Sequence, residues 1–600
     1  MPEDDRAVLF HEARSPLVDL PLYESGLHRD ACGVGLIAAR SGEPTHRMVR
    51  MAVDCLRRLD HRGAKAADGT GDGAGILTGI PFEVFERELA HRKLPVPERS
   101  RFGIAMVFLP PGQADEARAL VEGSLAYEGI GVLGWRVVPV DPTVLGRRAR
   151  DSMPLIEQVM VSAPTDVVDQ EDFERRLFLS RKYCERQADD LDLDGFAIAS
   201  ASTRTVVYKG LFAAKHVADF YWDLSDPAFT TTFAIFHQRY STNTFPAWEI
   251  AQPFRTLAHN GEINTVRSNR AWMAAREVDV TSPIWGDRSR DLSPFLQRNQ
   301  SDSGSLDNAF ELLIRSGRRV EHVKEMLMPS AWENLPGLDP DLQGFYEYHA
   351  FLTEPWDGPA AIAATDGRTV LAGMDRNGLR PARWAVSPNV VLVSSEAGVC
   401  PEEEAEAIMT GQLAPGELLH FDPAADRLRF SADVLRELAS VSPYREWTNN
   451  ETFYVQDPFD PLQDERFDPE RFARVFGYSP EDRRLIIEPM ANGQTPTGSM
   501  GSDTPLAVLS ASPRRLSHYF HQLFAQVTNP PMDPIREKLM MSLRTYLGRR
   551  GSLLEETPQQ AALIELASPI LSDAELEQIV RSGDPRFFSY WIASVFHVEQ

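Results

Sequence analysis

Short apolar runs alternate along the chain with longer segments in which apolar residues recur every three or four positions. The short runs, bounded by Gly, Pro, Asn or Asp, are typical of buried β-strands, whereas the recurrent spacing is typical of amphipathic helices. The predicted strands are 32–39, 102–109, 134–140, 196–202, 205–212, 231–241, 360–365, 369–375, 383–387 and 389–395. So many strands predict extensive β-sheet.

Two segments, 46–60 and 172–191, have the spacing of helices. The apolar face of the first includes Cys55, and the second buries Cys184, so we expect both cysteines in the core. Asn377-Gly378 indicates a turn between two strands, in a loop longer than a two-residue hairpin. From about 430 to 470 the chain is rich in Asp, Pro and Asn, and it is mostly helical in pattern afterwards. We expect a domain boundary in that stretch.

Length and charge narrow the possibilities. A chain of 600 residues exceeds the roughly 100–200 residues of one domain, so at least two domains are expected. Asp and Glu outnumber Lys and Arg by 87 to 62, which disfavours a nucleic-acid partner. No apolar stretch is long enough to span a membrane, and the first thirty or so residues do not resemble a secretory signal. We therefore expect a cytoplasmic protein without a membrane partner.

The four cysteines lie far apart and form no CxxC pair, so their spacing predicts neither a disulfide framework nor a zinc or iron–sulfur site. They are Cys32, Cys55, Cys184 and Cys400. Cys32 stands out because it directly precedes a glycine-rich apolar strand, in HRDACGVGLIAAR, and follows an acidic tail. It is either a buried structural residue or a nucleophile. In the second case, cleavage before Cys32 would create an α-amine with a pKa of about 7.7–8 next to the thiol, and residues 1–31 would be a propeptide.

Several long motifs occur in a fixed order. They are CGVG from Cys32, LDHRGAKAADGTGDGAG from Leu59, HQRYSTNTFPAW from His237, LAHNGEIN from Leu257, QSDSGSLDN from Gln300 and DRNGLRPAR from Asp375. Together they resemble the class II glutamine amidotransferases, in the longer form that opens the large subunit of glutamate synthase. Residues 489–510 and 519–543 resemble the central domain of that enzyme.

The resemblance implies an α+β fold, a four-layer αββα N-terminal-nucleophile hydrolase sandwich, followed by part of an α/β central domain. The implied boundaries are 1–31 for a propeptide, 32–430 for the amidotransferase domain, 431–470 for a linker and 471–600 for the truncated central domain.

The resemblance also implies two groups of site residues. Cys32 would be the nucleophile, with Asn260 and Gly261 donating N–H groups to the oxyanion. From the residues alone, Asn260-Gly261 reads equally as a simple turn. This pair and Cys32 are the expected catalytic residues.

The expected substrate-binding residues are Arg239, Asp302 and Arg62. The planar guanidinium of Arg239 suits the α-carboxylate of glutamine, although a surface ion pair is the alternative. Asp302 matches the residue that takes the substrate ammonium, but it also reads as a helix N-cap. Arg62 matches a residue that would hold Cys32 and its loop in place.

Two other patterns are set aside. GTGDGAG, residues 69–75, follows a helix and lacks GK[ST], so it predicts tight backbone packing rather than a dinucleotide or phosphate site. The histidines show no HExxH or paired ligand spacing, so we expect no metal site and a structural role for His237 and His259.

The resemblance implies hydrolysis of L-glutamine to L-glutamate and ammonia through a Cys32 thioester, the ammonia being destined for reductive amination of 2-oxoglutarate. The full-length enzyme uses FMN and a three-iron iron–sulfur cluster. This chain has no cysteine cluster for the latter, and we expect no cofactor in it. Because it also ends in an apolar run typical of a domain interior, we expect a fragment whose partner is the synthase portion or an electron-donating subunit. The electron donor stays open.

Two alternatives remain at this stage. The chain could deliver ammonia to a different acceptor on a partner chain, or it could be a catalytically silent glutamine-binding or scaffold domain. The presence of all the expected site residues argues against silence.

We predict that the active protein begins at Cys32, because the RDACGVG junction needs a free α-amine beside the thiol. The intact mass of the purified protein should correspond to loss of residues 1–31. Active protein with any other N-terminus would contradict this prediction.

Overall fold

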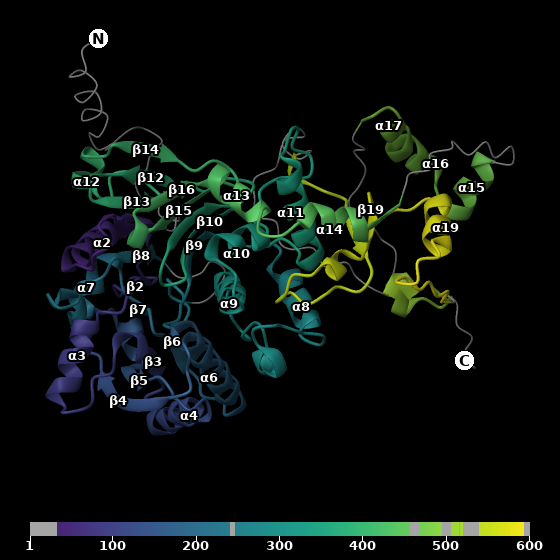
Figure 1. The fold of residues 1–600 in the computed structure, drawn as a ribbon. Helices are drawn as coiled ribbons and strands as arrows, with labels where there is room; N and C mark the ends of the chain where they lie inside the picture. Colours follow the sequence, from purple (N-terminus) through teal and green to yellow (C-terminus); the bar gives the residue numbers. More distant parts are fainter. Residues whose placement is uncertain are drawn as a thin grey trace, which may run out of the picture. The chain divides into compact units, whose positions relative to one another are not determined.

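The computed structural model describes residues 33–239, 246–455, 468–494, 506–514, 516–519 and 539–592 (Figure 1). It divides the chain into two compact units, which are described separately below. The first unit is Met1–Thr452, Gln526–Ser542 and Arg549–Leu563, and the second is Phe453–Ala525, Leu543–Gly548 and Ile564–Gln600.

A seven-stranded antiparallel sheet lies at the centre of the first unit, in the order β14-β12-β13-β1-β8-β2-β7. Its strands are β1 (Gly33–Ala39), β2 (Ala74–Gly79), β7 (Thr205–Gly210), β8 (Phe233–Gln238), β12 (Arg383–Val386), β13 (Val390–Ser394) and β14 (Met409–Gln412). Strands β1 and β8 pair from Gly33 opposite Gln238 to Ala38 opposite Phe233.

A second antiparallel sheet has the order β16-β15-β11-β10-β9. Its strands are β9 (Leu257–Gly261), β10 (Ala360–Thr365), β11 (Val370–Met374), β15 (Leu418–Asp422) and β16 (Arg427–Phe430). Alternate residues of the two sheets share one apolar core, in which Leu36 and Ile235 meet residues such as Ala363 and Leu419. The two sheets therefore pack face to face.

Helices cover the outer face of each sheet. α2 (His46–Arg58) buries Met48, Cys55 and Leu56 against the seven-stranded sheet. On the other side, α9 (Asp302–Arg315), α10 (Val320–Leu327) and α11 (Pro340–Leu352) form a second helical layer, with α9 against β9 and α10 against β11. In Figure 1 the strands β8, β15 and β10 lie between α2 and α10. This is the predicted αββα sandwich.

A four-stranded sheet, β4-β5-β3-β6, extends the first unit. It consists of β3 (Phe102–Leu109), β4 (Gly131–Val137), β5 (Leu155–Ser162) and β6 (Ala197–Ser202). One face packs on α4 (Ala114–Tyr127) and α6 (Gln170–Asp190), and the other contributes Ile104, Met106 and Phe108 to the same core as α2. Other helices of this unit include α3 (Phe82–His91), α5 (Arg147–Asp151), α7 (Val217–Phe220), α8 (Val266–Arg276) and α12 (Pro401–Ala405).

Within the predicted linker, α13 (Ser431–Ala439) and α14 (Tyr444–Glu451) pack against α11 and belong to the first unit. The returning segment, Arg549–Leu563, also joins this unit: the side chain of Gln560 accepts a hydrogen bond from the Tyr348 hydroxyl at 2.7 Å. The second unit contains a small sheet of β17 (Phe453–Tyr454), β18 (Thr545–Leu547) and β19 (Ile564–Leu566), with α15 (Pro469–Phe476), α16 (Pro480–Asp482), α17 (Glu488–Ala491) and α19 (Asp573–Arg581). In the described part of this unit helical residues outnumber strand residues, as the pattern beyond the predicted boundary indicates.

The ten predicted strands and two predicted helices are present among the described residues, with shifted ends. Cys55 and Cys184 are buried as expected. Asn377-Gly378 lies in the loop between β11 and β12, where Asp375 accepts a hydrogen bond from the Asn377 N–H at 2.7 Å. Among the described residues, no helix is both long enough and apolar enough to cross a membrane.

Candidate active site

The end of β8 lies beside the start of β1, where the predicted nucleophile joins the fold. Cys32 itself lies outside the described residues, but Gly33, the next residue in the chain, is the first of β1. Because Gly33 pairs with Gln238, Arg239 leaves β8 at the same end of the two strands.

Arg239 has an unusual backbone conformation. Its φ is 101°, a region that non-glycine residues sparsely populate. The Arg239 N–H donates to the Gly73 carbonyl at 2.7 Å, and the Arg239 carbonyl lies 2.8 Å from His237 Nδ1. Such a conformation persists when its surroundings hold it, and it is typical of binding and catalytic positions.

Asp72 contacts the side chain of Arg239, and the sequence analysis does not identify it as a site residue. Its Oδ2 is 3.3 Å from Arg239 Nε and accepts the Ala64 N–H at 3.0 Å, while its Oδ1 accepts a hydrogen bond from Gln238 Nε2 at 3.1 Å. Burial raises the pKa of Asp72 to about 6. The signal is an aspartate inside the GTGDGAG motif, whose glycines predict tight backbone packing beside the pocket.

The glycines of that motif do allow close packing. A Cβ at Gly71 would lie 2.3 Å from the nitrogen of Ala213, and one at Gly75 would lie 2.6 Å from Lys209 Cβ. A pocket of about 440 Å³ lies against this loop, and its lining includes Thr70, Asp72 and Arg239. Its size is in the range of small-molecule sites.

Asn260 and Gly261 form the end of β9 rather than an isolated turn. They pair with Ala361 and Ala360 of β10, and Asn260 is buried. A Cβ at Gly261 would lie 1.9 Å from the Pro359 carbonyl oxygen, so a side chain is excluded here. The backbone of this residue is therefore held close to its neighbour in a fixed position.

Asp302 is the first residue of α9, and the N-cap is Ser301, whose side chain accepts the Gly304 N–H at 3.0 Å. Asp302 Oδ2 instead accepts the N–H of Ile263, two residues beyond β9, at 2.9 Å. Burial raises the pKa of Asp302, so its carboxylate would gain from a cationic partner.

Two buried histidines connect these groups. His237, on β8, lies against the backbone of His259, on β9, and His259 Nδ1 is 2.7 Å from the Ser303 hydroxyl on α9. Burial lowers the pKa of both imidazoles to about 3, so both rings are neutral near pH 7. They link the Arg239 region to the β9 and α9 region in the structural role that the sequence suggested.

Arg62, at the end of the short 3-10 helix η1 (Asp60–Arg62), lies over the start of β1. Its Cδ is 3.3 Å from the position a Cβ would take on Gly33, and its Nε donates to Glu396 Oε2 at 2.6 Å. The described members of the predicted site thus surround the paired ends of β1 and β8 and the end of β9.

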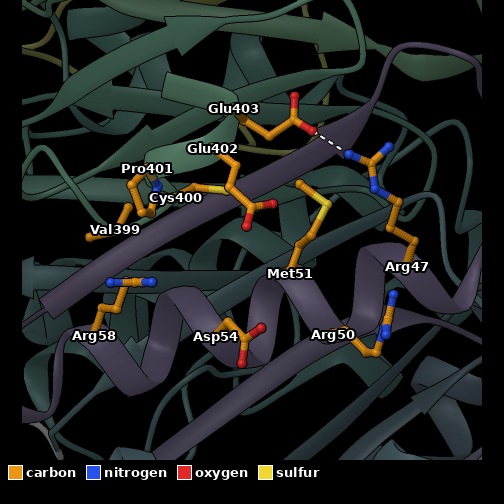
Figure 2. A pocket seen from close by; sticks show the side chains of 10 residues that line it. All are labelled: Arg47, Arg50, Met51, Asp54, Arg58, Val399, Cys400, Pro401, Glu402 and Glu403. Atoms are coloured by element: carbon orange, nitrogen blue, oxygen red, sulfur yellow. Dashed lines mark hydrogen bonds and ion pairs between the residues drawn. The ribbon is translucent and has the colours of Figure 1, made fainter. Parts of the chain in front are cut away.

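Figure 2 shows a different pocket, of about 240 Å³, between α2 and residues 399–403. Its lining includes Arg50, Cys400 and the ion pair of Arg47 with Glu403. None of the described residues of the predicted site lines it, so it is separate from the candidate active site.

The model of the class-II glutamine amidotransferases matches residues 32–447. The chain belongs to this family. A second model, the glutamate synthase central domain, matches residues 471–600. The amidotransferase match includes Cys32 and every other residue of the predicted site.

Similar proteins include ferredoxin-dependent glutamate synthase 2 of Synechocystis, 42% identical over 566 residues, which are 92% of this chain and 36% of that protein. The glutamate synthase [NADPH] large chain of Bacillus subtilis is 42% identical over 562 residues, 92% of this chain and 37% of that protein. The chain therefore spans about a third of the length of these relatives. Among solved structures, the B. subtilis glutamine phosphoribosylpyrophosphate amidotransferase matches with TM-score 0.24 and 15% identity, over 55% of this chain and 48% of that chain.

We predict that Asp72 makes stability depend on pH. Its pKa is raised from 3.8 to about 6 in the folded chain, so it stabilises the fold when protonated and this contribution is lost as pH rises through 6. A shift of this size corresponds to at most about 3 kcal/mol. Asp72→Asn cannot ionise, so the Tm of the variant minus that of the wild type should increase between pH 4 and pH 7.

The matched control is Asp68→Asn, in the same loop, because the backbone N–H groups of Arg148 and Thr70 lower the pKa of Asp68. Its Tm difference should stay flat above pH 5. A flat or falling difference for Asp72→Asn would show that Asp72 is not held in the way described.

Proposed function

We propose that the chain hydrolyses L-glutamine to L-glutamate and ammonia through a thioester on Cys32, and that the ammonia serves the reductive amination of 2-oxoglutarate in the synthase part of a longer enzyme. One observation carries the proposal. Arg239 has a strained backbone, its side chain contacts Asp72, and it lies at the end of β8 beside the start of β1. Cys32 is one residue before that start.

Arg239 and Asp302 bind the two charged ends of the amino acid. The guanidinium of Arg239 binds the α-carboxylate through paired hydrogen bonds. Asp72 orients this guanidinium through its contact with Arg239 Nε. The carboxylate of Asp302 takes the α-ammonium. This assignment is supported by the raised pKa of Asp302, because a cation relieves the cost of keeping a buried carboxylate charged.

The α-amine of Cys32 acts as the base. His237 and His259 are the buried imidazoles of this region, and with a pKa of about 3 they are too weak to remove a thiol proton near pH 7. The amine takes the thiol proton, the thiolate attacks the side-chain amide carbon, and the proton passes to the departing ammonia. Water then cleaves the thioester and releases glutamate.

Asn260 and Gly261 stabilise the oxyanion that forms at each attack. The side-chain N–H of Asn260 and the backbone N–H of Gly261 are suitable donors, and the close contact of Gly261 with Pro359 keeps the second donor in place. Arg62 packs over Gly33 and, through its bond to Glu396, holds the start of β1 in place.

The reduction of 2-oxoglutarate needs two electrons, which FMN and an iron–sulfur cluster carry in the full-length enzymes that the chain resembles. The described cysteines do not fit such a cluster, because Cys184 lies in a different core from Cys55 and Cys400. Relatives named for ferredoxin and for NADPH are equally similar, so the electron donor does not follow from these residues.

Cys32→Ala should abolish ammonia release from glutamine while leaving the circular dichroism spectrum unchanged, because it removes the nucleophile and no large core side chain. A glutamine-like diazoketone should label Cys32 and spare the buried Cys55, Cys184 and Cys400, as peptide mass spectrometry would show. Residual activity in Cys32→Ala, or labelling at another cysteine, would refute the proposed nucleophile.

Asn260→Ala and Arg239→Lys should separate the two kinds of binding. The oxyanion exists only after attack, so Asn260→Ala should lower kcat roughly 100-fold or more with little change in KM. Arg239→Lys loses the paired contact to the carboxylate and should raise KM about tenfold. Arg148→Lys, from the same pocket, is the control and should change neither. The reverse pattern in steady-state kinetics would exchange the two roles.

A further inference from the structure

Three side chains that can ligate a metal meet in the first unit, and none of them is a candidate active-site residue. They are His322 on α10, His349 on α11 and Glu556 in the returning segment Arg549–Leu563. The two histidines are buried, and one ligand atom from each of the three residues lies within 4.8 Å of the others.

The distances match a tetrahedral site in two of three edges. Metal bonds of about 2.0–2.2 Å from Zn²⁺ to nitrogen or oxygen place neighbouring ligand atoms about 3.3–3.5 Å apart. Glu556 Oε1 lies 3.4 Å from His322 Nε2 and 3.5 Å from His349 Nε2. The two Nε2 atoms are 2.7 Å apart, as expected when a single proton joins them without an ion. An ion would replace that proton and widen this edge alone.

Neighbouring groups orient two of the ligands as in known metal sites. His349 Nδ1 lies 2.7 Å from the Phe345 carbonyl, so it carries the ring proton and leaves the Nε2 lone pair directed at the cluster. The Tyr444 hydroxyl donates to Glu556 Oε2 at 2.6 Å, which leaves Oε1 for the ion. These are the outer contacts that fix ring tautomer and carboxylate direction around a bound metal.

The charge around the cluster both favours and limits an ion. Glu556 brings a carboxylate oxygen to the two imidazoles, and Arg318 faces the same oxygen. Arg318 Nε lies 3.3 Å from Oε1, so the guanidinium competes with a cation for the same oxygen.

We propose that His322, His349 and Glu556 bind one divalent transition-metal ion of the zinc class, with a fourth position for water. The ion joins α10, α11 and the returning segment, so its role is to fasten that segment to the helical layer. This proposal is independent of glutamine hydrolysis.

The test uses the full chain, stripped with a chelator and titrated with Co²⁺ and Zn²⁺. We expect one ion per chain, a visible Co²⁺ absorption band typical of four-coordination, and displacement by one equivalent of Zn²⁺. His322→Gln, His349→Gln and Glu556→Gln should each weaken binding at least tenfold. Tyr444→Phe should weaken it about 10–100-fold through loss of the outer contact.

Arg318→Gln should change the affinity for the ion in the opposite direction. Because it removes the competing cation, it should bind the ion more tightly than the wild type, a result that loss of folding could not produce. The control is His420→Gln, a buried histidine that contacts Arg429 and Glu321 outside the cluster, and it should leave binding unchanged. Absence of stoichiometric binding to the wild type and to Arg318→Gln would overturn the proposal. So would binding that survives in His322→Gln and His349→Gln.

Discussion

The antiparallel pairing of β1 with β8 is the constraint on which the candidate site depends. It fixes Gly33 opposite Gln238, and therefore sets where the chain enters the sheet relative to Arg239. Both faces of these strands are buried, with Leu36 and Ile235 toward the second sheet and Ile37 and Phe236 in the core that includes α2. A Cβ at Gly35 would lie 2.5 Å from the Phe236 ring opposite it, so close packing of these side chains fixes the register. The placement of Arg239 relative to the start of β1 thus follows from ordinary core packing.

Polar groups buried behind the site extend this control. Asp72, Gln238 and the Ala214 N–H form a connected series in which Gln238 accepts from Ala214 at 2.8 Å and donates to Asp72. This series lowers the stability of the folded chain near pH 7. Burial raises the pKa of Asp72, so keeping its carboxylate charged there costs free energy. Strain at Arg239 adds to this cost, which is consistent with a region selected for binding rather than for stability.

The sequence predicted β1, β3, β4, β6, β7, β8 and β10 to β13, but not β2, β5, β9 or β14 to β19. β2 contains three residues without large side chains in AGILTG, and β5 contains Glu157 and Gln158, which are buried through partners on other elements, Arg118 at 2.6 Å and Arg136 at 2.8 Å. β9 was recognised as a motif and not as a strand. Local pattern cannot reveal partners supplied by distant segments, and the same reason hid Asp72 and the cluster of His322, His349 and Glu556. The site residues themselves came from the family resemblance, since each had an equally good local explanation.

Because Arg549–Leu563 returns to the first unit, the compact unit and the domain defined by the family have different boundaries. The family boundary runs near residues 447–471, yet the aromatic side chains of Tyr348 and Tyr444 hydrogen-bond to Gln560 and Glu556, well beyond it. An excised amidotransferase that stopped at the family boundary would leave these hydroxyls and the adjoining apolar surface in water. If this unit were transferred from one enzyme to another, both stretches of chain would therefore have to be transferred together, although they are not contiguous in sequence.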